Sequence, residues 1–136
     1  MKNKRKNGLG KKTVKQRIVV IKCRVYLCDF VAIFGGKLSE AKKWFNMRYG
    51  QHLDEEDRAP SVVAHTAADD ETKNVMIWFK EMRPGARWVT HETLHAVSHV
   101  LRCAGIKHNY STEEAYAYLQ TWLVDQIGQE IWWKKK

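Results

Sequence analysis

Residues 90–97 read THETLHAV, and this stretch decides both the fold and the chemistry expected of the chain. It contains the pattern H-E-x-x-H within a run that suits an α-helix. Four helical residues rotate by about 400° and rise by about 6 Å, so His91 and His95 project from adjacent turns of one face and can bind one metal ion. Glu92 is rotated by about 100° from His91, which places its carboxylate beside such an ion instead of on it. A general base that takes a proton from a metal-activated water belongs in that position.

Chance does not readily explain this motif. The chain has six His among 136 residues, and random order at this composition would produce H-E-x-x-H only about 0.02 times. The competing interpretation is an amphipathic helix whose wetter side carries histidine and glutamate incidentally. The two interpretations differ in what must follow downstream, because a catalytic zinc needs three protein ligands and an open position for water.

The third ligand must come from outside the motif. His99 continues the i, i+4 series, but its Cα lies about 12 Å along the helix axis from that of His91, too far for both rings to reach one ion. Leu101 occupies the position where the metzincin pattern requires a histidine, so that class is excluded. Glu114, on the first turn of the next predicted helix, is the strongest candidate. The adjacent Glu113 is the alternative if that helix starts one residue differently.

Glu114 has a structural explanation as well. Ser111 and Glu114 fit a capping box, in which the N-cap hydroxyl and the N3 carboxylate each satisfy a free backbone amide. Glu114 lies on the same face of its predicted helix as Tyr118, Thr121 and Asp125, and Asp125 could accept a hydrogen bond from the outer nitrogen of a ligating histidine.

Several side chains are candidates for stabilising a tetrahedral oxyanion: Arg87, His108, Tyr110, Tyr116 and Tyr118.

At these residues the sequence resembles the gluzincins, whose zinc site joins H-E-x-x-H to a glutamate on a later helix. It is similar in particular to small metallopeptidase-like proteins encoded in phage and bacterial genomes. The resemblance covers about residues 74–127 and rests on His91-Glu92-x-x-His95 followed by EAYAYL at 114–119. It implies a Zn2+ ion bound by His91, His95 and Glu114, with Glu92 as the catalytic base in peptide-bond hydrolysis.

These features predict a zinc-dependent metallopeptidase, a hydrolase that acts on a peptide or protein substrate through a metal-activated water. The resemblance also implies that an extended substrate pairs with an exposed strand, for which residues 74–79 are suggested. The alternative is a noncatalytic, zinc-stabilised binding or regulatory protein with a basic tail that contacts nucleic acid. Glu92 speaks against this alternative, because a structural zinc site fills the fourth position with protein and needs no acid beside the metal.

Basic charge is concentrated at the ends of the chain. The net charge is +9, yet residues 1–17 hold eight Lys or Arg and no acid, and residues 134–136 add three more. Removing these eleven from the 24 basic side chains leaves 13 against 15 acidic ones, a remainder near −2. We expect a disordered basic tail at 1–16, one zincin-like metallopeptidase domain at 17–133 and a basic tail at 134–136. The N-terminal tail either contacts nucleic acid weakly and nonspecifically or simply aids solubility.

The remaining composition predicts a cytoplasmic protein with no membrane partner. No run reaches the roughly 18 apolar residues of a membrane span, and no apolar signal-peptide core follows the lysine-rich start. Cys23, Cys28 and Cys103 are odd in number and lack C-x-x-C spacing, which argues against a disulfide framework and against a cysteine-based zinc site.

The expected fold class is α+β, with a short, mostly antiparallel sheet packed on the H-E-x-x-H helix and a following antiparallel helix. The sheet and the first helix would form one layer and the two zinc-site helices the second. Strand-forming residues occupy 18–21, 24–27 and 29–34, as one strand or two, and 61–67 with 74–79 as a hairpin.

Helices are predicted at 38–49, with Ser39 as N-cap and Gly50 as stop, at about 87–104, with Gly105 as stop, and from 111 to about 128. The middle helix carries the metal motif. Its expected core face comprises Thr90, Leu94, Val97, Leu101 and Ala104.

Overall fold

The computed structural model describes residues 15–69 and 72–133. The basic tails expected at 1–16 and 134–136 therefore lie outside the described residues, except for Lys15 and Gln16. None of the helices in the described part combines the length and the hydrophobicity that a bilayer crossing needs. The elements are β1 (Arg17–Cys23), β2 (Cys28–Phe34), α2 (Leu38–Tyr49), β3 (Ala64–Ala67), β4 (Val75–Phe79), α3 (Ala86–Cys103), the short 3-10 helix η1 (Tyr110–Thr112) and α4 (Glu113–Ile131).

The strands form one four-stranded mixed sheet in the order β1-β2-β4-β3, which confirms the α+β class. β1 pairs with β2 and β3 pairs with β4 in antiparallel fashion, whereas the central pair, β2 and β4, is parallel. The prediction that residues 74–79 form an exposed strand for substrate pairing is therefore wrong. β4 lies inside the sheet, and all of its residues are buried. In the described part, the edge strands are β1 and β3.

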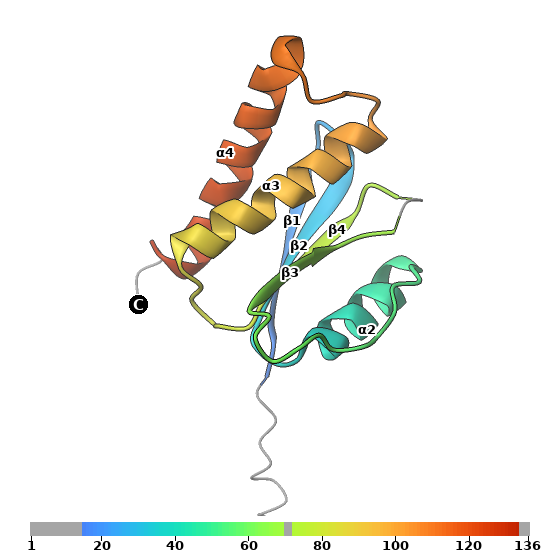
Figure 1. The fold of residues 1–136 in the computed structure, drawn as a ribbon, viewed down its shortest axis with the longest axis vertical. Coiled ribbons are helices and arrows are strands. Elements are labelled where there is room, and N and C mark those ends of the chain that lie inside the picture. Colours follow the sequence, from blue (N-terminus) through green and yellow to red (C-terminus); the bar gives the residue numbers. More distant parts are fainter. Residues whose placement is uncertain (1–14, 70–71, 134–136) are drawn as a thin grey trace, which may run out of the picture.

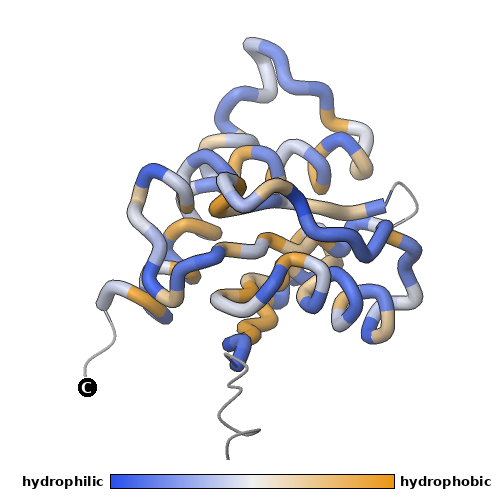
Figure 2. Tube along the Cα trace, turned by 60° about the horizontal axis from the view of Figure 1, so that its bottom comes forward, coloured by the Kyte–Doolittle hydropathy of each residue, from blue (hydrophilic) through white to orange (hydrophobic). Residues whose placement is uncertain are grey.

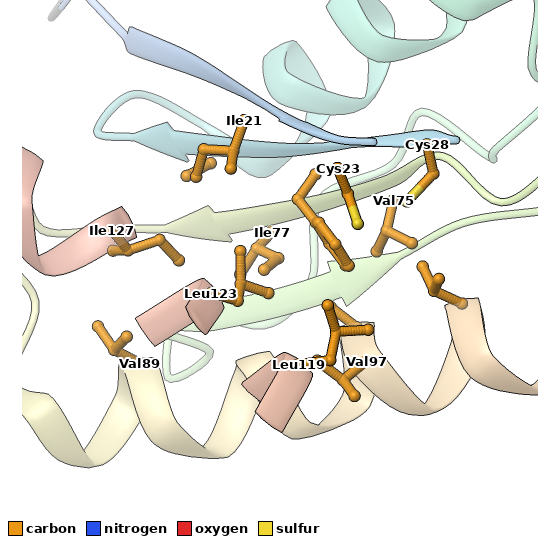
Figure 3. Packing of buried hydrophobic residues seen from close by; sticks show 14 of the residues in the cluster. Ile21, Cys23, Cys28, Val75, Ile77, Val89, Val97, Leu119, Leu123 and Ile127 are labelled. Carbon is orange, nitrogen blue, oxygen red and sulfur yellow. The ribbon is translucent and has the colours of Figure 1, made fainter. Parts of the chain in front are cut away.

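Helices cover both faces of the sheet, so the molecule has three layers and not the two expected (Figure 1). One face packs on α2 through a cluster that includes Ile33, Phe45 and Trp78. The other face packs on α3 and α4, and Figure 3 shows side chains such as Ile77 and Leu123 meeting in this larger core. Strand side chains alternate between the faces, so β2 and β4, covered on both sides, are apolar almost throughout. Hydrophobic stretches of the chain accordingly lie mainly toward the middle of the trace (Figure 2).

The stretch 24–27 is the turn between β1 and β2, and the prediction of a strand there is wrong. The β1–β2 register runs from Arg17 opposite Phe34 to Cys23 opposite Cys28, which leaves four residues to reverse the chain. Leu27 adopts a positive φ of 54°, and its side chain is exposed. The apolar composition of this stretch suggested a strand, but the pairing of its neighbours determines the turn.

Helix α2 has the predicted bounds and the predicted stop. Gly50 has a left-handed φ of 65°, a conformation that favours glycine at the end of a helix. The N-cap is Lys37 and not Ser39, because the Lys37 backbone N–H donates to Glu40 Oε1 at 3.0 Å. Ser39 is the second residue of α2 and donates from Oγ to Asp57 Oδ2 at 3.1 Å, which ties α2 to the following loop.

Helix α3 ends before Gly105, as predicted, but its buried face is rotated from the one expected. Val97 and Leu101 are buried, whereas Thr90 and Ala104 are exposed and Leu94 is 42% exposed. The helix contacts the sheet on one side and α4 on another, so its buried surface is a wide sector. That sector comprises Val89, Glu92, Thr93, Ala96, Val97, His99, Val100 and Leu101.

Helix α4 begins without the predicted capping box. Asn109 Oδ1 accepts hydrogen bonds from the backbone amides of Ser111 at 3.0 Å and Thr112 at 3.2 Å, so Asn109 caps η1 and Ser111 is not an N-cap. The helix then continues to Ile131, beyond the predicted end near 128. It packs against α3 as the expected neighbour, with Gln120 Nε2 donating to the Thr90 carbonyl oxygen at 3.0 Å.

Candidate active site

The two motif histidines meet on the exposed side of α3. Their Nε2 atoms are 3.3 Å apart, and both rings are exposed to solvent. Two nitrogen ligands of a tetrahedral zinc, each about 2.0–2.1 Å from the ion, would lie about 3.4 Å apart. The same separation suits a hydrogen bond between the rings, provided that one Nε2 carries the proton. The separation of the His91 and His95 Nε2 atoms is therefore compatible both with a shared metal ion and with a hydrogen bond between the rings.

Glu92 points from α3 toward the edge strand β3 and is buried, with 6% of its surface exposed. Its Oε1 accepts a hydrogen bond of 2.6 Å from the Thr66 hydroxyl, whose oxygen also lies 3.1 Å from the Glu92 backbone oxygen. A single hydroxyl proton favours the carboxylate, because hydrogen bonds to charged acceptors are the shorter and stronger ones. Thr66 thus holds a buried acid beside the histidine pair.

A cleft of about 630 Å3 runs between α3 and β3 and reaches the loop after α2. Glu92 and His95 line it from α3, whereas His65 and Thr66 line it from β3. Arg58 contributes from the loop. The candidate base and one candidate metal ligand therefore face the same concave surface, which is where substrates usually bind.

Charged groups around the cleft are partly paired. Lys42, whose side chain is 2% exposed, lies with Nζ 3.1 Å from Asp54 Oδ1 and donates to the Glu56 carbonyl oxygen at 3.0 Å. The hydrogen bond from Lys42 holds the pKa of the Asp54 carboxyl below its ordinary value. Burial lowers the pKa of His65, and the cations of Arg58 and Lys42 lower it further.

Glu114 does not lie with the histidines. It is exposed on the first turn of α4 and does not line the cleft. Helix α4 packs on the side of α3 where Gln120 Nε2 contacts the Thr90 carbonyl oxygen and Thr93 Oγ1, whereas Glu92 faces β3. Within residues 15–69 and 72–133, no three His, Cys, Asp or Glu side chains gather closely enough to hold a metal ion.

The alternative and supporting acids are also outside the cleft. Glu113 shares the exposed first turn of α4 with Glu114. Asp125 is exposed, and in the described part its carboxylate makes no hydrogen bond to His91 or His95. The structure therefore brings His91 to His95 and places Glu92 and His95 on one cleft, and the role of Glu114 stays a prediction.

His99 lies in the wall of the cleft and is buried. Its Nε2 is 3.0 Å from the Thr72 carbonyl oxygen and 3.5 Å from Cys103 Sγ. The His99 ring therefore connects α3 to Thr72 in the segment between β3 and β4, and it supports the wall of the cleft.

The oxyanion candidates lie elsewhere. Tyr116 donates from its hydroxyl to the Ile106 carbonyl oxygen at 2.8 Å, and His108 stacks on it with ring centroids 4.2 Å apart. The Arg87 guanidinium lies 5.3 Å from the Trp88 ring centroid. Tyr118 belongs to another hollow, between α4 and the β1–β2 turn. None of the five candidates, Arg87, His108, Tyr110, Tyr116 and Tyr118, lines the cleft.

No family model, curated protein or solved structure matches this chain. Thr66, Arg58 and Arg102 are the cleft residues that sequence reasoning missed. They belong to no motif. Arg102 lies on α3 itself, whereas the packing of β3 and of the loop after α2 brings Thr66 and Arg58 to the cleft.

Proposed function

We propose that this chain is a zinc-dependent metallopeptidase whose active site is the cleft between α3 and β3. The observation that carries the proposal is the 3.3 Å separation of the His91 and His95 Nε2 atoms beside the buried carboxylate of Glu92. If the two surface histidines had no function, there would be no reason for Glu92 to be buried and hydrogen-bonded to Thr66. A buried acid is costly unless it is paired, so its position points to a role in the cleft.

His91 and His95 would supply two imidazole nitrogens to the ion. When bound, zinc lowers the pKa of a water ligand toward about 7 and polarises a substrate carbonyl. Glu92 would accept a proton and pass it to the departing amine, while Thr66 fixes the direction of its carboxylate. The short hydrogen bond from Thr66 to Oε1 leaves Oε2 as the oxygen available for this proton transfer.

Glu114 remains the predicted third ligand. A catalytic zinc takes three protein ligands, and the two histidines satisfy that requirement only in part. Coordination by Glu114 requires the start of α4 to approach the histidine pair, since α4 packs on the Thr90 side of α3. Substitution of Glu114 tests this step separately from the histidine pair.

The substrate would lie along β3. This strand is an edge of the sheet, and it forms one wall of the cleft that contains Glu92. An extended peptide can add to such an edge through main-chain hydrogen bonds. The substrate is therefore a peptide in extended conformation, with its scissile carbonyl near His95 and Glu92.

Metal binding tests the proposal most simply. Metal-free protein should take up one zinc per chain, and His91→Ala and His95→Ala should each weaken binding by about 100-fold or more, because each removes a ligand. His52→Ala is the matched control, since His52 is an exposed histidine outside the cleft. Zinc binding that is equally tight in the parent and in His95→Ala would refute the site.

A further inference from the structure

The cleft is lined by two arginines that form no ion pair with a described acid. Its charged lining consists of Lys42, Asp54, Arg58, Glu92 and Arg102. Lys42 and Asp54 pair with each other, and Glu92 is bound by Thr66. Across residues 15–69 and 72–133, neither Arg58 nor Arg102 takes part in an ion pair. Within this part of the chain, no ion pair prevents either guanidinium group from binding a ligand.

We propose that the cleft selects peptides that carry an acidic side chain, whose carboxylate Arg58 and Arg102 bind. The inference rests on the proposed peptidase function, because it names the substrate class of the same cleft. The two arginines come from different elements, the loop after α2 and the end of α3, and they line one concave surface with Glu92. A guanidinium binds a carboxylate through two parallel hydrogen bonds, which gives geometric selection as well as attraction.

The charge of Arg58 already acts inside the cleft. After burial, the Arg58 cation is the largest cause of the lowered pKa of His65, a ring on the wall of the same cleft. The Arg58 cation disfavours a second positive charge in the cleft beside His65, and for the same reason it favours a negatively charged ligand there. The lining of the cleft carries three cationic side chains against two carboxylates, and this surplus of positive charge attracts acidic segments from solution.

A peptide pair that differs only by Glu or Gln tests the inference. We expect the zinc-loaded parent to cleave the Glu peptide with about tenfold higher kcat/KM, the scale of one charge-assisted contact in a half-open site. Arg58→Gln and Arg102→Gln should each lower this preference about threefold, and the double variant should abolish it. Arg83→Gln is the control, because Arg83 is an exposed arginine outside the cleft.

Binding of the same peptides to Glu92→Gln protein, measured by calorimetry, separates this inference from the proposed function. One outcome is that no peptide is cleaved, while the Glu peptide binds more tightly than the Gln peptide and does so only when Arg58 and Arg102 are present. In that case the peptidase proposal fails and the acidic specificity stands. If both peptides are cleaved and bound equally well, the specificity is refuted while the peptidase function stands. A preference that persists in the double variant also overturns the assignment to these arginines.

Discussion

Replacing Thr66 with valine should destabilise the protein through Glu92. The Thr66 hydroxyl donates to Glu92 Oε1 at 2.6 Å, and Glu92 is only 6% exposed. Valine keeps the branched shape but removes the donor, so a buried carboxylate loses its partner. Losing a hydrogen bond to a charged group costs about 1.5–3 kcal/mol. Thr66 is half-buried, so water replaces part of the bond, and we expect a loss of about 1.5–2 kcal/mol in the free energy of unfolding.

Chemical and thermal unfolding measure this effect independently of catalysis. The expected loss corresponds to a fall in Tm of about 5–8 °C for a folded part of this size. Thr66→Ser keeps the donor and should retain most of the stability. In a Glu92→Met background, Thr66→Val should cost clearly less, because the carboxylate is already gone and only the contact of Thr66 Oγ1 with the Glu92 backbone oxygen is lost.

A double-mutant cycle decides the result. If Thr66→Val is as stable as the parent, or costs as much in the Glu92→Met background as in the parent, the hydrogen bond does not hold Glu92 and the reasoning about the buried acid is wrong. In active protein, the same substitution should reduce turnover less than Glu92→Gln does, since Thr66 positions the base and does not transfer the proton.

Three further predictions concern the thiols, the third ligand and the basic tail. Burial raises the pKa of Cys28 to about 12, so iodoacetamide at pH 8 should modify the exposed Cys103 in folded protein and reach Cys28 only after denaturation; equal labelling rates would contradict this packing. If Glu114 is a ligand, Glu114→Gln should weaken zinc binding by about 100-fold while Glu113→Gln leaves it unchanged, and titration of both variants distinguishes the neighbours. Removing residues 1–14 deletes six Lys or Arg and should flatten the salt dependence of DNA binding without changing Tm; an unchanged salt slope would show that the tail makes no phosphate contacts.

Local signals in the sequence were sufficient for most of the helices. The bounds of α2 follow from its apolar spacing and from Gly50, and the end of α3 follows from Gly105. Both glycines adopt a positive φ, a conformation that favours glycine, so each glycine in the sequence predicts the end of a helix. The turn at 24–27 has no such local signal, because its composition suits a strand. Only the pairing of β1 with β2 shows that these residues reverse the chain.

The site was predictable only where it depends on helix geometry. The approach of His91 to His95 follows from the four-residue spacing, and the structure places their Nε2 atoms 3.3 Å apart. The position of Glu114 depends instead on which side of α3 is covered by α4. That choice is made by long-range packing, including the contact of Gln120 with Thr90, and no local pattern encodes it. The same limit explains why Thr66 was missed.

Hydrolysis by Glu92→Gln protein tests the central claim most directly. Glutamine keeps the size of the side chain and can still accept a hydrogen bond from Thr66, but it cannot take up a proton. We predict that the zinc-loaded parent cleaves an unstructured polypeptide and that Glu92→Gln lowers turnover by about 10²–10⁴-fold, with zinc content and Tm nearly unchanged. Equal rates in the two proteins, or no cleavage by zinc-loaded parent under any condition that permits the substrate to bind, would contradict the account.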